Sequence, residues 1–246
     1  MASISYGMVV NLDWHLTAEG ETILQYFYNP QTNGRKLFGL LERPAVPSNI
    51  EEVCYKLFFV GKSGAGKSAA IARLAGTTFM ATHVESYGIR KTNIFWPVKI
   101  WNKIILFELH CWESSDSSLK KCGHILPACK DKADAFVYVF SHSDASSFLD
   151  IPQLMNKLTK DEPDHPANII IGTRYSATSS ATSKMEVSLA DTKQFETKWQ
   201  IPVLKMNKLS PTDRNETHQM APLLNIICEQ LWIRDQEYIL KQGLTS

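Results

Sequence analysis

One short run of residues has the composition and spacing of a loop that wraps around phosphate groups. Residues Gly61–Ser68 read Gly-Lys-Ser-Gly-Ala-Gly-Lys-Ser and fit the pattern G-x-x-x-x-G-K-[ST]. Glycines let the backbone approach phosphates closely, and successive N–H groups then point inward at a helix N-terminus. The Lys67 ammonium is expected to reach the β- and γ-phosphates, and the Ser68 hydroxyl to bind Mg²⁺. The predicted phosphate-binding residues are Gly61, Lys62, Ser63, Gly64, Ala65, Gly66, Lys67, Ser68 and Ala69.

The cysteines and histidines show no comparable pattern. The five cysteines are Cys54, Cys111, Cys122, Cys129 and Cys228, and none of them forms a C-x-x-C pair. Cys122 and Cys129 flank His124, but structural zinc sites use four ligands in close pairs, so reduced thiols are the preferred interpretation. The histidines have neither His-x-x-x-His nor Ser-His-Asp spacing. The sequence therefore gives no support to a metalloenzyme or a hydrolase triad.

Strand-like and helix-like segments alternate around the loop. Val53–Val60 is an apolar run, as in a strand buried on both faces, and it leads directly into Gly61. Alternation of this kind predicts an α/β fold with a mostly parallel central sheet and helices on both faces. The other predicted elements are helix Ser68–Ala75, strands Ile94–Ile100 and Ile104–Leu109, strand Ala135–Phe140, a helical stretch Ala145–Lys160, strand Asn168–Gly172, helix Leu189–Trp199, strand Pro202–Met206 and a closing helix around Leu223–Trp232.

The pattern along the chain suggests three parts. Residues 1–50 are expected to form an extension with a short helix near Thr17–Tyr28, residues 51–237 the main domain, and residues 238–246 a tail. The segment Tyr175–Ser183, rich in serine, threonine and alanine, is expected to be a mobile surface loop.

Charge and hydropathy exclude several classes of partner. The formal net charge of the 246-residue chain is +1, which gives no support to nucleic-acid binding. No apolar run is long enough to span a bilayer, and no secretory signal, myristoylation glycine or prenylation cysteine is visible. We therefore expect a cytoplasmic protein without a lipid anchor or transmembrane segment of its own.

The loop and the strand hairpin after it resemble a Rab-type small GTPase of the Ras superfamily, with gaps, over residues 52–237. Several stretches more narrowly resemble the small GTPases of the ciliogenesis and planar polarity effector (CPLANE) complex. They are Phe38–Pro44, Phe95–Pro97, Ser118–Lys121, Glu229–Trp232, Trp14-His15 and Ala18–Gly20. The resemblance implies a P-loop small GTPase fold, GTP or GDP with Mg²⁺ as cofactors, and Fuzzy and Inturned as partners. It further implies a role in cilium assembly, planar polarity and vesicle traffic at the ciliary basal body.

The two switch segments of such GTPases depart from the usual pattern. The first switch normally carries a threonine that binds Mg²⁺, and Ser86, with a similar hydroxyl, is at the matching place. The second switch normally reads D-x-x-G followed by glutamine, whereas this chain has Glu113-Ser114-Ser115-Asp116-Ser117. Glu113 could hold Mg²⁺ through a water, and Glu113 and Asp116 are the candidate catalytic groups. Because the glycine and glutamine are missing, we expect very slow intrinsic hydrolysis.

The guanine-reading motif N-K-x-D is also replaced. Thr173-Arg174-Tyr175-Ser176 stands where the motif is expected, and a serine hydroxyl cannot replace the two bonds that an aspartate accepts from guanine. Losing such a charge-assisted pair costs about 1.5–3 kcal/mol. Thr173, Arg174 and Ser176 are the candidate base-contacting residues, and Arg174 could stack over the base through its planar guanidinium.

These departures favour a partner-binding, guanine-nucleotide-binding module with weak GTP hydrolysis. The alternative is an active GTP-hydrolysing molecular switch that uses Glu113, Asp116 or a group supplied by a partner. A P-loop kinase or ATPase is less favoured, because the sequence has no arginine-rich lid segment and no second substrate site.

Overall fold

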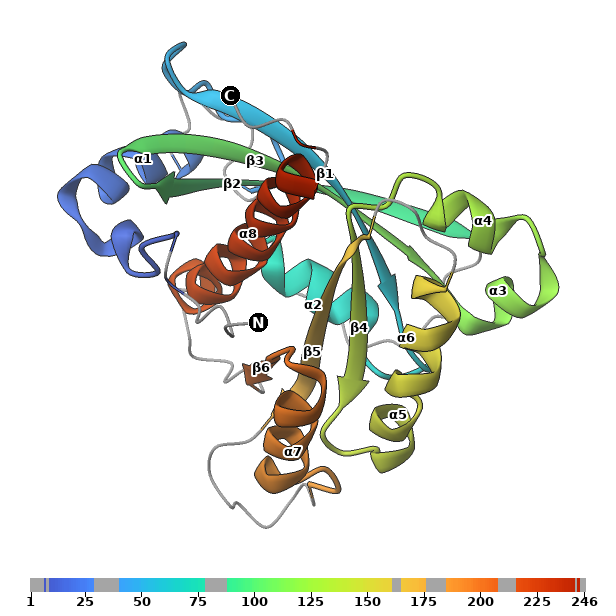
Figure 1. Cartoon of the computed structure of the whole chain (residues 1–246). Coiled ribbons are helices and arrows are strands. Elements are labelled where there is room, and N and C mark those ends of the chain that lie inside the picture. Colours follow the sequence, from blue (N-terminus) through green and yellow to red (C-terminus); the bar gives the residue numbers. More distant parts are fainter. Residues whose placement is uncertain are drawn as a thin grey trace.

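The structure is a computed structural model, described for residues 7, 9–28, 40–77, 88–160, 165–175, 185–207, 216–241 and 243. Its centre is a six-stranded sheet with the order β2-β3-β1-β4-β5-β6 (Figure 1). β2 and β3 are antiparallel, and the other neighbouring pairs are parallel. The strands are β1 Glu51–Val60, β2 Ile89–Ile100, β3 Lys103–Ser114, β4 Ala135–Ser141, β5 Ala167–Tyr175 and β6 Val203–Asn207. The predicted α/β fold with a mostly parallel central sheet is confirmed.

Two hydrophobic cores lie on opposite faces of this sheet. Leu57 and Phe59 of β1 belong to the core shared with α2 and α8, whereas Phe58 and Val60 belong to the core shared with α4, α6 and α7. Adjacent strand residues point to opposite faces, so this alternation indicates a sheet covered on both sides. The helices are η1 Trp14–Leu16, α1 Ala18–Tyr28, α2 Lys67–Leu74, α3 Asp116–Lys121, α4 Ile125–Lys130, α5 Ala145–Leu149, α6 Ile151–Thr159, α7 Leu189–Trp199 and α8 Glu216–Lys241.

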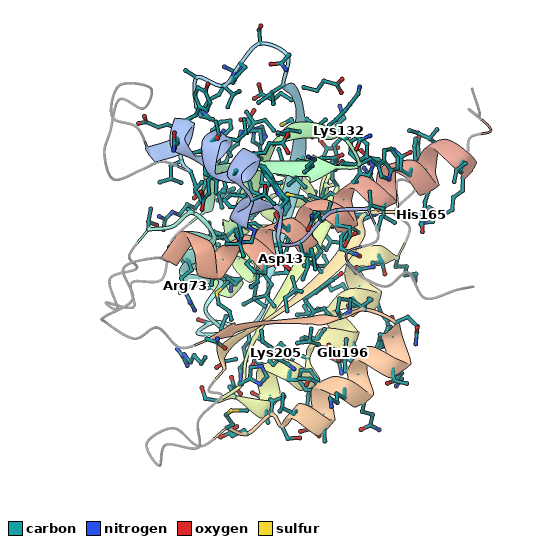
Figure 2. The ribbon with its side chains drawn as sticks, turned by 90° about the vertical axis from the view of Figure 1, so that its left-hand side faces the viewer. Asp13, Arg73, Lys132, His165, Glu196 and Lys205 are labelled. Carbon is teal, nitrogen blue, oxygen red and sulfur yellow. The ribbon has the colours of Figure 1, made fainter. Side chains whose placement is uncertain are left out.

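Polar contacts attach the covering helices to the sheet. Glu196 of α7 accepts a hydrogen bond from the N–H of Val203 at 2.8 Å, at the start of β6 (Figure 2). On the other face, the indole of Trp96 in β2 donates to Asn225 of α8 at 2.8 Å. None of the helices in the described part of the chain is long and apolar enough to cross a membrane.

The hairpin strands are longer than the sequence predicts. β2 begins at Ile89 rather than Ile94, and β3 continues beyond Leu109 to Ser114. In this added part of β3, half-buried His110 is followed by buried Cys111, so no continuous apolar run marks it. Pairing with β1 stabilises this segment as a strand, although its local sequence does not predict one.

The helical stretch predicted at residues 145–160 is two helices, α5 and α6. Asp144 caps α5 by accepting the N–H groups of Ser146 at 3.0 Å and Ser147 at 3.3 Å. Pro152 has no N–H to donate to residue 148, so a single continuous helix would lose a backbone bond at that point. The single predicted helix is therefore corrected to a pair.

The short helices α3 and α4 were not predicted, whereas α7 has the predicted limits. α8 extends well beyond the predicted Leu223–Trp232 and continues across residue 237 to Lys241. The division into 1–50, 51–237 and 238–246 remains a prediction. Most of the predicted surface loop 175–183 lies outside the described residues.

The N-terminal extension is packed into the core on the α8 side. Trp14 and Phe27 are fully buried there, and the predicted helix near Thr17–Tyr28 is present as α1. The anchor is Glu229 of α8, whose fully buried carboxylate accepts N–H bonds from Gly7 at 2.8 Å, Val9 at 2.9 Å and Val10 at 3.2 Å. A buried carboxylate is tolerated only where such donors replace its hydration.

Replacing this anchor should therefore loosen the extension. We expect Glu229→Gln to lower the free energy of unfolding by about 1.5–3 kcal/mol, because the charge-assisted bonds to backbone N–H groups are lost. Urea denaturation measures the change, and limited proteolysis should show faster cleavage near residues 7–10. Glu237→Gln, at an exposed position of the same helix, is the matched control. Equal stabilities of the two variants would contradict this role for Glu229.

Candidate functional site

The loop Gly61–Ser68 lies between the end of β1 and the start of α2, as the sequence predicts. Two of its glycines, Gly61 and Gly66, leave little or no room for a side chain. A Cβ on Gly61, whose φ is +151°, would lie 2.2 Å from the carbonyl oxygen of Val139 in β4. A Cβ on Gly66, whose φ is +98°, would lie 3.1 Å from the hydroxyl oxygen of Thr173. Strands β4 and β5 therefore lie directly against the loop, and glycine is the residue that allows this close approach.

The lysine of the motif lies across the loop. Lys67 Nζ donates to the carbonyl oxygen of Gly61 at 2.8 Å and lies 3.3 Å from that of Lys62. Lys67 is also the first residue of α2, after Gly66 at the N-cap, and no side chain caps this helix end. A helix N-terminus without a side-chain cap, combined with an ammonium group, favours an anion.

The hydroxyl of Ser68 meets a buried carboxylate. Ser68 Oγ donates to Glu113 Oε2 at 2.6 Å, and Glu113 is only 3% exposed. Glu113 is near the end of β3, paired in register with Phe59 of β1, and Arg90 Nη1 lies 3.8 Å from its other oxygen. Hydroxyl and carboxylate oxygens are the donors that Mg²⁺ prefers, so these residues fit a magnesium ion bound together with phosphates.

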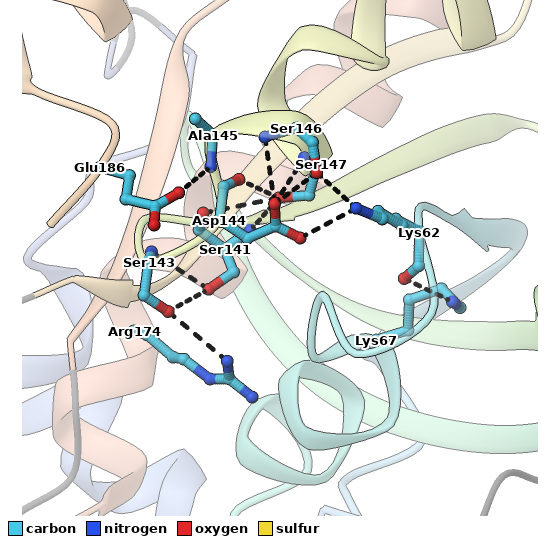
Figure 3. Close-up of polar contacts among 10 residues, drawn as sticks. All are labelled: Lys62, Lys67, Ser141, Ser143, Asp144, Ala145, Ser146, Ser147, Arg174 and Glu186. Carbon is cyan, nitrogen blue, oxygen red and sulfur yellow. Dashed lines mark hydrogen bonds and ion pairs between the residues drawn. The ribbon is translucent and has the colours of Figure 1, made fainter. Parts of the chain in front are cut away.

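A second polar group braces the loop from the side of α5. Lys62 Nζ contacts the Ser146 hydroxyl and lies 3.4 Å from Asp144 Oδ2 (Figure 3). The Ser146 hydroxyl, and to a smaller extent Ser147 N–H and Lys62, lower the pKa of the Asp144 carboxyl. Asp144 thus stays charged while it caps α5 and faces Lys62. This ion pair is half-exposed, so it fixes geometry more than it adds stability.

The predicted base-contacting residues have different positions. Thr173 is buried and its hydroxyl donates to the carbonyl of Ala65 at 2.6 Å, with the carbonyl oxygen of Phe140 3.1 Å away. It thus acts on the site by holding the loop. Arg174 is exposed, with a φ of +55°, and its guanidinium lies 3.5 Å from the Ser143 hydroxyl (Figure 3).

Two predicted site residues, Ser86 and Ser176, lie outside the described residues. The described segment that follows Ser86 is fixed to the end of β3. Gly88 donates its N–H to Ser118 Oγ at 3.1 Å and accepts a bond from Ser114 Oγ at 2.8 Å. The chain next to the first switch is therefore attached to the segment that corresponds to the second.

Asp116, the other candidate catalytic residue, is the first residue of α3. Ser115 caps this helix by accepting the N–H of Ser118 at 3.1 Å. The place of the usual glycine and glutamine is thus the first turn of a capped helix. The start of α3 is determined by neighbouring residues, because serine directly before a helix is a favoured N-cap.

Sequence reasoning missed Asp144, Ser146 and Arg90. Asp144 and Ser146 follow a buried strand, and side chains after the carboxyl ends of parallel strands gather at one edge of the sheet, which is a usable signal. Arg90 comes near Glu113 only through the β2–β3 register, in which these two residues are partners. No spacing along the chain indicates that contact.

The fold and this site define the class of the protein. The model of the Ras family matches residues 56–221, and the chain belongs to that family. Its relatives include "Ciliogenesis and planar polarity effector 2" from Mus musculus, 35% identical over 244 residues, which are 94% of this chain and 92% of that protein. The Homo sapiens protein of the same name is 34% identical over 243 residues, again 94% and 92% of the two chains. "GTP-binding protein REM 2" from Homo sapiens is 28% identical over 127 residues, which cover 52% of this chain and 36% of that one. The resemblance to the CPLANE small GTPases is therefore confirmed.

Substitution of the loop glycines Gly61 and Gly64 tests whether the loop lies directly against β4. Gly61→Ala should destabilise the fold by about 3 kcal/mol or more, because the new methyl group meets a strand carbonyl. Gly64→Ala, where a Cβ meets nothing within 4 Å at a φ of +79°, should cost about 1–2 kcal/mol from backbone strain alone. Chemical denaturation of both variants measures the difference. Equal losses would show that the loop does not press against β4.

Proposed function

We propose that this chain is a guanine-nucleotide-binding module of the Ras family that acts through partner binding and hydrolyses GTP weakly. The observation that carries the proposal is the pairing of Ser68 with buried Glu113 at the mouth of a glycine-lined loop. These groups are suited to hold Mg²⁺ and phosphate oxygens together. The segments that would respond to the nucleotide also include Gly88, which is attached to Ser114 and Ser118.

Within this proposal the residues have separate tasks. Lys67 leaves the loop carbonyls for the β- and γ-phosphates, and Ser68 binds Mg²⁺ directly while Glu113 holds it through water. Mg²⁺, when bound, neutralises phosphate charge. Ser86 is proposed as a further metal ligand, and Ala69, in the first turn of α2, as a backbone contact. Arg174 and Ser176 are proposed to contact the base, and Thr173 to position Ala65 of the loop.

The proposed cellular role rests on the relatives and on the sequence resemblance. The names of the relatives refer to ciliogenesis and planar polarity. We accordingly assign the chain to the CPLANE complex, with Fuzzy and Inturned as the partners that the resemblance implies. Cilium assembly and vesicle traffic at the ciliary basal body follow from the same resemblance.

The bound nucleotide is the first test. The protein is purified, denatured and its supernatant separated by chromatography. We expect GTP in near-stoichiometric amount, and none in Lys67→Ala, because the ammonium that holds the phosphates is gone. Lys193→Ala, exposed on α7, is the control that should keep its nucleotide. ATP would point to a kinase or ATPase, and an empty wild-type protein would contradict nucleotide binding by the isolated chain.

The position of helix α3 supports the proposal of slow GTP hydrolysis. In the D-x-x-G pattern Asp116 replaces the glycine and Ser117 the glutamine that orients the attacking water, and both belong to the first turn of a helix capped by Ser115. Positioning carries much of phosphoryl-transfer catalysis, so their replacement removes a main contribution to the rate.

A single-turnover assay with GTP should therefore give a rate clearly below about 3–5 × 10⁻⁴ s⁻¹, the intrinsic rate of Ras. Asp116→Gly combined with Ser117→Gln should raise it about tenfold or more, because glutamine can orient the attacking water. Asp116→Gly with Ser117→Ala, which lacks the amide, should not. A wild-type rate equal to that of Ras would instead support an active molecular switch.

A further inference from the structure

Three metal-ligating side chains come together on the open part of the sheet. Cys54 of β1 and Glu108 and His110 of β3 each place one ligand atom within 4.8 Å of the other two. Cys54 is exposed, and Glu108 and His110 are half-buried, with side chains 23% exposed. Within the described residues this is the one such group of three or more His, Cys, Asp or Glu side chains. The pair Cys122 and Cys129 with His124, considered from the sequence, forms no such group.

The strand register creates this cluster. β1 and β3 are parallel with Cys54 opposite Glu108 and Lys56 opposite His110. All three ligating side chains lie on the face that carries Phe58 and Val60, beyond the part covered by α4. Because both strands belong to the central sheet, the backbone fixes the separation of the three side chains before any ligand arrives.

The three ligand atoms are close enough to share one zinc ion once their side chains rotate. Zinc bonds of about 2.3 Å to sulfur and 2.0–2.1 Å to nitrogen place these two atoms about 3.6 Å apart in a tetrahedron. Cys54 Sγ lies 3.4 Å from His110 Nε2 and 3.5 Å from Nδ1, so the sulfur lies over the face of the ring, and the imidazole must rotate before one of its nitrogens can share a metal with the sulfur. The 2.7 Å between His110 Nε2 and Glu108 Oε1 must lengthen to about 3.4 Å. Rotations of the half-buried Glu108 and His110 side chains supply these changes.

The neighbouring residues support a ligand role. Asn93 of β2 donates from Nδ2 to Glu108 Oε1 at 3.0 Å, as partners of metal-binding carboxylates do.

We propose that Cys54, Glu108 and His110 form a zinc-binding site, separate from the phosphate loop, with a fourth coordination position open to water. Mixed thiolate, imidazole and carboxylate donors select zinc over magnesium or calcium, which prefer oxygen alone. Three protein ligands with one open position are typical of accessible zinc sites rather than closed structural ones. On β3, His110 precedes Glu113 by three residues and points to the opposite face, so the two sites are about 10 Å apart along the strand and lie on opposite sides of the sheet.

The test uses the full chain, reduced and loaded with nucleotide and Mg²⁺, so that the phosphate loop is already filled. Co²⁺ is titrated as an optical substitute for zinc, and the thiolate-to-cobalt charge-transfer band reports ligation by cysteine. The phosphate loop contains no cysteine, so Co²⁺ bound there gives no such band. We expect the band to saturate at one Co²⁺ per chain and to disappear on addition of one equivalent of Zn²⁺.

Variants identify the ligands. Cys54→Ser should abolish the band, and Glu108→Gln and His110→Gln should each weaken Zn²⁺ binding tenfold or more. Cys122→Ser and His124→Gln, elsewhere on the surface, should bind as the wild type does. X-ray absorption at the zinc edge of the wild type, which requires no variant to fold, should show one sulfur with nitrogen and oxygen ligands. Absence of the band, its persistence in Cys54→Ser, or unchanged affinity in Glu108→Gln and His110→Gln would overturn the proposal.

Discussion

The parallel pairing of β1 with β3 is the constraint on which the site depends. Opposite residues of parallel strands share a face, so the pairing of Phe59 with Glu113 directs the Glu113 carboxylate toward α2. There it meets the hydroxyl of Ser68 in the first turn of the helix. A slip of one residue would turn Glu113 to the opposite face and remove the oxygen pair that fits Mg²⁺. The apolar cores on both faces fix the register, because such a slip would also move their side chains to the opposite face, where they do not match the packing.

The same fold shows why the loop keeps its shape although the residues that normally read guanine are replaced. Thr173 holds the carbonyl of Ala65, Lys67 holds that of Gly61, and Lys62 reaches Asp144. Each contact joins the loop to itself or to a neighbouring strand end. The backbone of the loop is thus held by the protein's own groups, and binding of a phosphate chain would require mainly that the Lys67 side chain leave the loop carbonyls. Pre-organisation of this kind lowers the cost of binding a ligand.

Local chemistry explains which features could be predicted from the sequence. The phosphate loop has a motif, and β4 is apolar from Ala135 to Phe140. Helix α7 is preceded by the N-cap Ser188, which forms a capping box with Asp191. Each of these elements can therefore be predicted from a few neighbouring residues. The full length of β3 could not be predicted, because His110 is stabilised there by cross-strand neighbours. The division of α5 from α6 is marked in the sequence by Pro152, which has no N–H for a continuous helix. The sequence assigns Ser68 and Glu113 roles at the same metal ion but does not predict their direct contact, and the contact between Arg90 and Glu113 required the register.

The two faces of β3 carry different chemistry for one geometrical reason. Its odd-numbered residues from Phe107 to Glu113 face α2 and α8, so they are apolar until the strand reaches the phosphate loop. Its even-numbered residues Glu108, His110 and Trp112 face the other way, where cover by α4 is incomplete. The Lys56 ammonium of β1 lies 4.2 Å from the centre of the Trp112 ring. It also donates to carbonyls of α4 and of the turn after it, so this face is covered at the end of β3 that is nearer the phosphate loop. Beyond Lys56 the side chains of this face are exposed, as Cys54 is, or half-buried, as Glu108 and His110 are. Polar and ligating side chains there keep access to water and cost little, so one rigid strand can carry two separate sites.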